Sequence, residues 1–139
     1  MIKPFTSEWA SAMRVAINAN AAYKEAAAKW TWPVALVVEA NAALGYPAAV
    51  AVELALDRGT CSDARVVPPD QVKADFVLRA SLDTWRALSA GTLDAVGAVS
   101  TGKVKLTGSM MTLMMHAKAA KALVACARDV PTHFPEAAR

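Results

Sequence analysis

Residues 32–57 read WPVALVVEANAALGYPAAVAVELALD in one-letter code, and this stretch predicts a β-hairpin. Apolar side chains alternate with small or charged ones on both sides of Gly45, which is typical of two strands that share a turn. We expect the strands over 32–42 and 48–57. The pattern is that of a sheet with one covered face.

The register of this hairpin follows from the position of its turn. If the turn is centred on Gly45, Val38 lies opposite Val52 and Leu36 lies opposite Leu54. The larger apolar side chains then share one face, because successive side chains of a strand point to opposite faces. We expect that face to be buried.

The opposite face of the hairpin carries alanines together with Glu39 and Glu53. Two carboxylates that face each other could act on a substrate as general acid and general base. Here both lie among small residues on the face that we expect to meet water. The sequence therefore favours a solvated, structural pair over a catalytic one.

The rest of the chain predicts further strands and several helices. Three more strands are expected, near 64–67, at 74–80 and at 103–107. Helices are predicted over 7–30, 82–89, 92–99 and 109–129. Asn18 and Asn20 interrupt the first helical segment and indicate a bend between two shorter helices.

Length and composition indicate one globular domain. The chain has 139 residues, 55% of them hydrophobic, and a formal net charge of +3. Alanine supplies 32 residues, so the remaining apolar side chains suffice for one ordinary core. We expect a single domain over 1–139 with three parts: a helical start at 7–30, the sheet and helices at 31–130, and a loose tail at 131–139.

A membrane segment is not expected. The richest apolar stretch, Pro33–Leu56, contains two glutamates and is broken by Gly45 and Pro47. The first residues lack the apolar core of a signal peptide. We therefore expect a cytoplasmic protein.

Nucleic-acid binding is not expected either. The helices at 82–89 and 92–99 are spaced like a helix-turn-helix motif. The second of them has no Arg, Lys, Asn or Gln that could contact bases or phosphates. The small net charge also gives little attraction for a phosphate backbone.

The chain lacks the motifs of the common enzyme and metal sites. It has no G-x-S-x-G, Walker or G-x-G-x-x-G sequence. Cys61 and Cys126 are isolated and predicted to be reduced, and His116 and His133 have no partner at ligand spacing. We therefore predict a protein without catalytic residues, metal or cofactor.

A methionine cluster opens the last predicted helix. Residues 109–115 read SMMTLMM and hold four of the six methionines. On a helical wheel Leu113 points with the core, whereas Met110 and Met114 project with the charged side. This end of the helix either lies under a loop, where methionine fills gaps, or borders a cavity or an interface.

Three segments, taken in order, resemble the sterol carrier protein type 2 family. They are Ala74–Ser81, the helix with Trp85 and Leu88 before a Gly-Thr-Leu-Asp turn, and Gly102–Gly108. The family has a strand, a short helix behind a Ser or Thr cap, and a Gly-Lys-x-Lys-x-x-Gly strand. The resemblance covers roughly residues 30–125.

The resemblance implies an α/β (α+β) fold with a five-stranded, mixed and mostly antiparallel sheet whose one face is covered by helices. It also implies an apolar tunnel between sheet and helices, lined or gated by the last helix. The candidate ligand-binding residues carried over are Met110, Met111, Leu113, Met114, Trp85, Leu88, Phe76, Leu78, Val104 and Leu106.

Two functions remain open at this point. The first is a non-catalytic carrier that holds a fatty acid, an acyl-CoA or another lipid or apolar small molecule in the tunnel. The alternative is a module for homodimerisation or partner binding, with a closed core that side chains fill. For the methionine cluster, the sequence favours equally a helix end under a loop and a helix end that borders a cavity or an interface.

Overall fold

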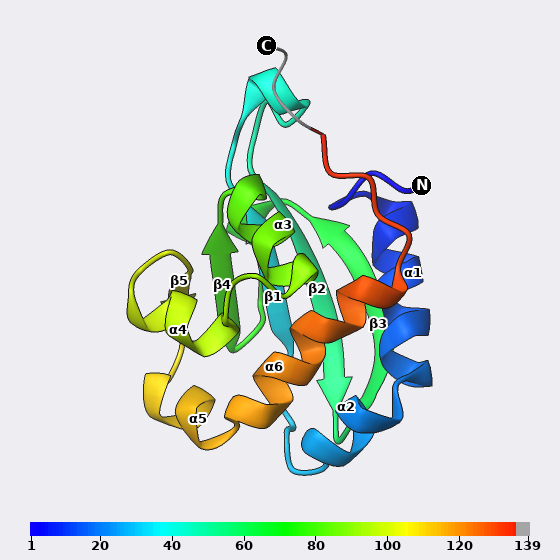
Figure 1. Cartoon of the computed structure of the whole chain (residues 1–139), viewed down its shortest axis with the longest axis vertical. Coiled ribbons are helices and arrows are strands. Elements are labelled where there is room, and N and C mark those ends of the chain that lie inside the picture. The colour runs from blue at the N-terminus through cyan, green and yellow to red at the C-terminus, as the bar shows by residue number, and fades with distance from the viewer. Residues whose placement is uncertain (136–139) are drawn as a thin grey trace.

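The five-stranded sheet confirms the predicted fold class (Figure 1). The computed structural model describes residues 1–135. The strands pair in the order β3-β2-β1-β4-β5. Their bounds are β1 Val34–Val38, β2 Val50–Asp57, β3 Thr60–Val67, β4 Phe76–Ala80 and β5 Lys105–Thr107. The sheet is mixed, because β1 and β4 run parallel while the other neighbouring pairs run antiparallel.

The helices are shorter and more numerous than the sequence patterns predict. Their bounds are α1 Ser7–Ala19, α2 Ala21–Ala26, α3 Leu82–Ala90, α4 Ala95–Ser100, α5 Met110–Met115 and α6 Ala117–Cys126. Short 3-10 turns lie at Ala42–Leu44, Pro69–Gln71 and Ala127–Asp129. The bend predicted in the helical start is present. Asn20 ends α1, and its side chain caps α2 by accepting a hydrogen bond from the Tyr23 backbone amide at 2.8 Å.

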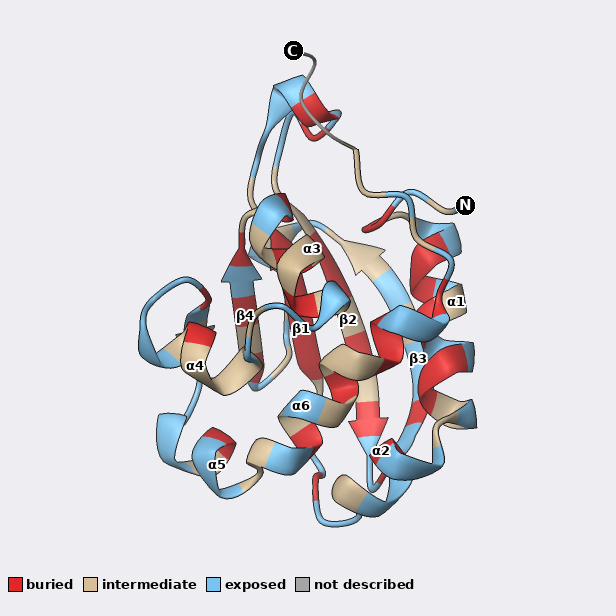
Figure 2. Ribbon diagram, viewed as in Figure 1, coloured by how far each residue is buried: buried red, intermediate tan, exposed pale blue. Residues whose placement is uncertain are grey.

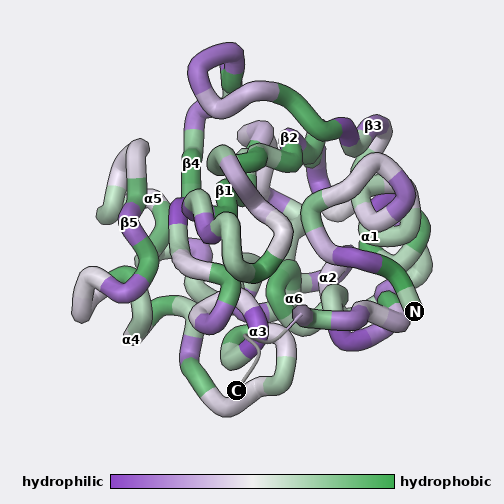
Figure 3. The backbone as a smooth tube through the Cα atoms, turned by 90° about the horizontal axis from the view of Figure 1, so that it is seen from above, coloured by the Kyte–Doolittle hydropathy of each residue, from purple (hydrophilic) through white to green (hydrophobic). Residues whose placement is uncertain are grey.

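One face of the sheet is covered by helices. In Figure 1, α3 and α6 lie in front of the strands and α1 lies beside β3, and Figure 3 shows α1, α2, α3 and α6 on one side of the sheet. Val34, Leu36 and Val38 of β1 join the core on this side. Figure 2 shows buried residues along β1 and along the inner stripe of α1. The hydrophobic core therefore lies between the sheet and these helices.

The register of the first hairpin differs from the prediction by two residues. Val38 pairs with Val50, not with Val52, and the rest of the strand shifts with it. A 3-10 turn at Ala42–Leu44 ends in Gly45, so the chain reverses before this glycine instead of around it. A shift of two residues leaves every side chain on its predicted face.

The other face of the sheet is covered around Glu53, which the sequence predicts to be open, while Arg79 and Lys105 on the same face are exposed. The β3–β4 connection crosses it, and the backbone amides of Lys73 and Ala74 donate to the Glu53 carboxylate at 2.8 and 3.1 Å. Arg65 pairs with the same carboxylate at 3.2 Å. Burial alone would raise the pKa of Glu53, but these donors lower it below its ordinary value. Glu53 thus anchors the connection, while Glu39 pairs separately with Arg79 at 3.8 Å.

The turn between β2 and β3 positions α2. Gly59 has a φ of +85°, and a Cβ at this residue would lie 2.8 Å from the Lys24 Cα atom. Glycine is therefore required both for the left-handed conformation and for the close approach of α2. This contact brings the side chain of Tyr23 over the end of the hairpin.

The helix predicted over 109–129 is divided at His116. The backbone of His116 leaves the helical region, with φ −115° and ψ 34°, and separates α5 from α6. Its ring packs edge-on against Trp30 and Trp32, with centroids 5.4 and 5.6 Å away. These ring contacts fix the corner between the two helices.

Part of the tail predicted to be loose is held against the N-terminus. The Ile2 amide donates to the Pro131 carbonyl and the His133 amide donates to the Ile2 carbonyl, both at 2.8 Å. The Trp9 indole donates to the Thr132 hydroxyl at 3.1 Å. Residues 136–139 of that tail lie outside the described residues. Within 1–135, no helix combines the length and the apolar character needed to cross a membrane.

Candidate functional site

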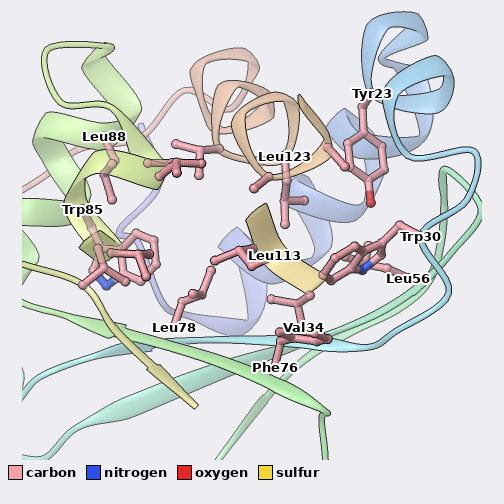
Figure 4. A pocket seen from close by; sticks show the side chains of 17 residues that line it. Tyr23, Trp30, Val34, Leu56, Phe76, Leu78, Trp85, Leu88, Leu113 and Leu123 are labelled. Atoms are coloured by element: carbon pink, nitrogen blue, oxygen red, sulfur yellow. The ribbon is translucent and has the colours of Figure 1, made fainter. Parts of the chain in front are cut away.

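An apolar pocket lies between the sheet and the helices (Figure 4). Its floor comes from β1, β2 and β4, and its walls come from α2 to α6 and from the segments before β1 and β5. The lining residues are Tyr23, Trp30, Val34, Leu56, Phe76, Leu78, Trp85, Leu88, Ala95, Val96, Val99, Val104, Leu113, Ala119, Ala120, Leu123 and Val124.

Helix α3 forms one wall of this pocket. It begins where the Ser81 hydroxyl accepts from the Thr84 amide at 3.2 Å, and it ends at Gly91 in the left-handed conformation. The indole N–H of Trp85 donates to the backbone carbonyl of Val37 at 2.9 Å. This bond ties the helix to the sheet and turns the apolar face of the indole toward the pocket.

Aromatic rings close the opposite end. The Trp30 indole N–H donates to the Trp32 carbonyl at 2.7 Å. The Trp30 ring packs against Phe76 and His116, with centroids 4.8 and 5.4 Å away. Tilted and edge-on ring contacts of this kind hold large rings in fixed orientations. This wall is therefore rigid.

The pocket offers almost no polar atoms to a ligand. Of the lining side chains in the described part of the chain, only those of Tyr23, Trp30 and Trp85 carry a nitrogen or an oxygen. Both indole N–H groups already donate to backbone carbonyls. The Tyr23 hydroxyl is the remaining polar group, and charged side chains do not occur in the described lining.

The pocket is nearly closed. Its cavity volume is about 40 Å³, room for only a few water molecules at the roughly 10–15 Å³ that each one needs. Pockets that hold small organic ligands are typically about 300–1,000 Å³. An apolar ligand therefore fits only after part of the wall moves outward.

Six of the ten predicted ligand-binding residues line this pocket. They are Phe76, Leu78, Trp85, Leu88, Val104 and Leu113. The other four predicted residues, Leu106, Met110, Met111 and Met114, do not line it. Leu106 is half-buried on β5. In α5 only Leu113 is buried, so the methionines lie on the outer side of this short helix and face solvent.

The ten candidate residues include none from α2, α4 or α6, although the helix predicted over 109–129 contains α6. The alternation of the strands and the resemblance pointed to β4, α3 and the last helix. The alanines and valines of α4 and α6 have no distinctive pattern, although small side chains at helical spacing leave room for a cavity. Tyr23 lies within the helical segment predicted over 7–30 and is not among the candidate ligand-binding residues. A phenolic hydroxyl at an apolar position of this helical pattern was the available sign that Tyr23 contributes to the site.

The cysteines are not placed for chemistry in this pocket. Cys61 and Cys126 are buried, free, and absent from its described lining. Burial raises the pKa of each thiol to about 11, so both stay protonated at neutral pH. A protonated, buried thiol is a poor nucleophile.

The chain was compared with known proteins. The model of the SCP-2 sterol transfer family matches residues 14–121. A crystal structure of sterol carrier protein 2 is 37% identical, with a TM-score of 0.87, and the alignment covers 92% of this chain and 99% of that one. No match is found among curated protein sequences.

Two further solved structures share the fold. A conserved hypothetical protein of Thermus thermophilus, described as a candidate sterol carrier protein, is 36% identical with a TM-score of 0.86, and the alignment covers 96% of this chain and 93% of that one. The apo form of sterol carrier protein 2 from Yarrowia lipolytica is 21% identical, with a TM-score of 0.59. The alignment covers 93% of this chain and 97% of that one, and this likeness supports the fold alone.

The family model spans the whole sheet and most of the helices that line the pocket. The chain therefore belongs to the SCP-2 sterol transfer family.

Proposed function

We propose that this protein is a non-catalytic carrier that binds one lipid or other apolar molecule in the pocket between sheet and helices. The observation that carries the proposal is the uniformly apolar lining, which continues from the sheet to the helices. Each methylene group transferred from water into such a lining contributes about 0.8 kcal/mol. An acyl chain of about a dozen methylenes thus gains on the order of 10 kcal/mol before the costs of ordering and association.

The family membership and the side chains that line the pocket both support the proposed carrier function. The related structure that is 37% identical is named sterol carrier protein 2. The described lining holds neither a charged side chain nor a thiol or aliphatic hydroxyl that could attack a substrate. Such a lining suits binding and release without a chemical step. Apolar contacts discriminate weakly between chain lengths, so a fatty acid, an acyl-CoA and other lipids all remain within this class.

Helix α5 is the part of the wall that moves most easily. It buries a single side chain, that of Leu113, against the pocket. Exposing one leucine costs about 1.5–3 kcal/mol, which three or four bound methylenes would offset at about 0.8 kcal/mol each. Outward movement of α5 would withdraw Leu113 and leave its place to the ligand. The break at His116 provides a corner about which α5 can turn.

The decisive experiment identifies what the protein carries. Protein purified without detergent is denatured and extracted with organic solvent, and the extract is analysed by mass spectrometry. We expect one apolar lipid per chain, and a fluorescent fatty acid should bind to lipid-free protein with the same stoichiometry. An extract without lipid, from a protein that also ignores the fluorescent fatty acid, would overturn the carrier function.

A further inference from the structure

The side chain of Tyr23 enters the pocket from α2. The residue is 1% exposed, and Figure 4 shows its ring extending inward with the hydroxyl oxygen at the inner end. The cap from Asn20 and the contact of Lys24 with Gly59 fix the start of this helix and its position over the hairpin. The hydroxyl is therefore held in place, and it is the one polar atom that the described lining leaves open to a ligand.

The Tyr23 hydroxyl has no hydrogen-bond partner within residues 1–135. Other buried aromatic polar groups do have one, as the Tyr46 hydroxyl shows by donating to the Pro4 carbonyl at 2.6 Å. All fully enclosed polar side-chain atoms of the described residues are paired. The Tyr23 hydroxyl must therefore border open space, and the pocket that it lines provides this space.

We propose that the Tyr23 hydroxyl donates a hydrogen bond to an uncharged oxygen of the bound ligand. This inference rests on the proposed carrier function. It names the ligand class more narrowly, as an apolar molecule whose buried end carries one hydroxyl or carbonyl oxygen. A buried hydroxyl that lacks a partner is unfavourable, and phenylalanine would avoid this cost. In the complex, the ligand oxygen would be the hydrogen-bond acceptor that the Tyr23 hydroxyl lacks within the protein.

The charge of the surroundings excludes an ionised group at this point. Lysine, arginine and histidine are absent from the described lining, so a buried carboxylate would lack a counter-ion. Burial raises the pKa of Tyr23 above its ordinary value, which keeps the phenol protonated and able to donate at neutral pH. A neutral oxygen is the acceptor that fits this donor.

The test compares ligands that differ only in one oxygen. Lipid-free protein is loaded with an apolar fluorescent dye, which is then displaced by 1-decanol, 2-decanone or decane. The affinity of each oxygen-bearing compound relative to that of decane should be about fivefold higher for the native protein than for Tyr23→Phe, the effect of one hydrogen bond. This ratio cancels the cost of desolvating the oxygen, which both proteins share. Tyr23→Phe should bind decane as before and unfold at the same temperature as the native protein or higher.

Tyr46→Phe provides the matched control. It removes a hydroxyl that is bonded within the protein and does not line the pocket, so it should lower the melting temperature without changing the ligand preference. If the affinity of decanol relative to decane is the same for the native protein and for Tyr23→Phe, the role of Tyr23 is wrong while the carrier function stands. If no compound displaces the dye, the carrier function itself is in doubt.

A second inference rests on a different feature, the methionine face of α5. We use this term for Met110, Met111, Met114 and Met115, which are 41%, 74%, 49% and 76% exposed. The other large hydrophobic residues exposed in the described chain are Met1 and Val15. Four flexible thioether side chains on one short helix form an adaptable apolar surface.

This methionine face lies within a basic stretch. The sequence contains no acidic residue between Asp94 and Asp129 but has five basic ones. Exposed lysines flank α5, namely Lys103 and Lys105 before it and Lys118 after it. The charge of Lys121 is offset by Asp94, with which it forms an ion pair at 3.4 Å. The backbone of Asp75 packs near Gly108, just before α5, so the Asp75 carboxylate adds one negative charge to this region. The methionine face is therefore apolar, and the exposed residues that flank it in the sequence carry more positive than negative charge.

The geometry points to a surface of anionic lipid as the partner of this face. The methionines would enter the boundary between headgroups and acyl chains, and the lysines would meet the negative headgroups. A second copy of the chain fits less well, because symmetric pairing would bring the same positive charges together. Leu113 lies on the same helix and lines the pocket, so this contact would join the lipid surface to the binding site.

Vesicle sedimentation tests this docking. The native protein should bind vesicles of phosphatidylcholine with phosphatidylglycerol, and binding should weaken with pure phosphatidylcholine and with added salt. Replacing both Met111 and Met115 by serine should lower the partition coefficient about fivefold. Val15→Ser removes an equally exposed apolar side chain from α1 and should have no effect.

Two results would overturn the docking inference. The first is equal vesicle binding by the native protein, the double methionine variant and Val15→Ser. The second is a native protein that ignores anionic vesicles but forms a dimer by light scattering, with the double variant monomeric. That second result would assign the methionine face to a second copy of the chain.

Discussion

Replacing Ala120 by phenylalanine is expected to lower the affinity for an apolar ligand about 50- to 200-fold. Ala120 lies on α6 and its side chain lines the pocket. A phenyl ring at this position occupies the room of three to four ligand methylenes, each of which contributes about 0.8 kcal/mol. Titration with a fluorescent fatty acid measures the loss, and the lipid extracted from the purified variant should fall in parallel.

Ala122→Phe provides the matched control for this change. Ala122 is on the same helix, is half-buried to the same class as Ala120, and does not line the pocket. Both variants add the same ring to a partly filled core, which costs about 1–3 kcal/mol of stability. Equal affinity of the two variants for the fatty acid would place the ligand outside this pocket.

The sheet could be predicted because its determinants are local. Alternation assigned Leu36 and Val38 to the inner face, and this assignment survives the two-residue shift in register, since a shift of two residues keeps the face. The position of the turn was harder to predict. It depends on how Ala42–Leu44 coils before Gly45, which small residues leave undetermined.

The outer face of the sheet shows where local patterns fail. Alanines beside Glu53 indicated a solvated surface, but the β3–β4 connection covers them and its amides bind the carboxylate. The burial of Glu53 thus depends on a chain segment 20 residues away in sequence. Alternation within one strand contains no information about such a cover.

Part of the candidate site could be predicted, because local patterns identify the side chains that face the core. Residues that face the core from strands or from α3 were found, because periodicity identifies inward faces. The methionines were expected to border a cavity or an interface, and the division of the helix at His116 decides their orientation. That division comes from ring contacts of His116 with Trp30 and Trp32. Neither tryptophan is close to the methionines in sequence, so the pattern of residues 109–129 alone could not reveal the division of this helix.

Leu113→Ala is expected to change stability and ligand affinity in opposite directions. Leu113 is the one buried side chain of α5 and it lies in the pocket. Its truncation should lower the free energy of unfolding by about 2–4 kcal/mol, because buried contacts are lost and a cavity remains. Urea denaturation of lipid-free protein measures this change.

The same truncation should tighten binding by about tenfold or more. The native protein must withdraw Leu113 from a cavity of about 40 Å³ before a ligand fits, and the variant has already removed that obstacle. A fluorescent fatty acid should therefore bind the variant more tightly and raise its melting temperature more than that of the native protein. Binding measured in parallel with unfolding separates the two effects.

Leu106→Ala is the control for this experiment. Leu106 is half-buried on β5 and does not line the pocket, so its truncation should lower stability modestly and leave affinity unchanged. If Leu113→Ala lowers affinity and stability together, Leu113 is a fixed contact for the ligand and α5 is not the moving wall. A gain in affinity would instead mean that the closed pocket is a resting state, held shut by one leucine that a few ligand methylenes can replace.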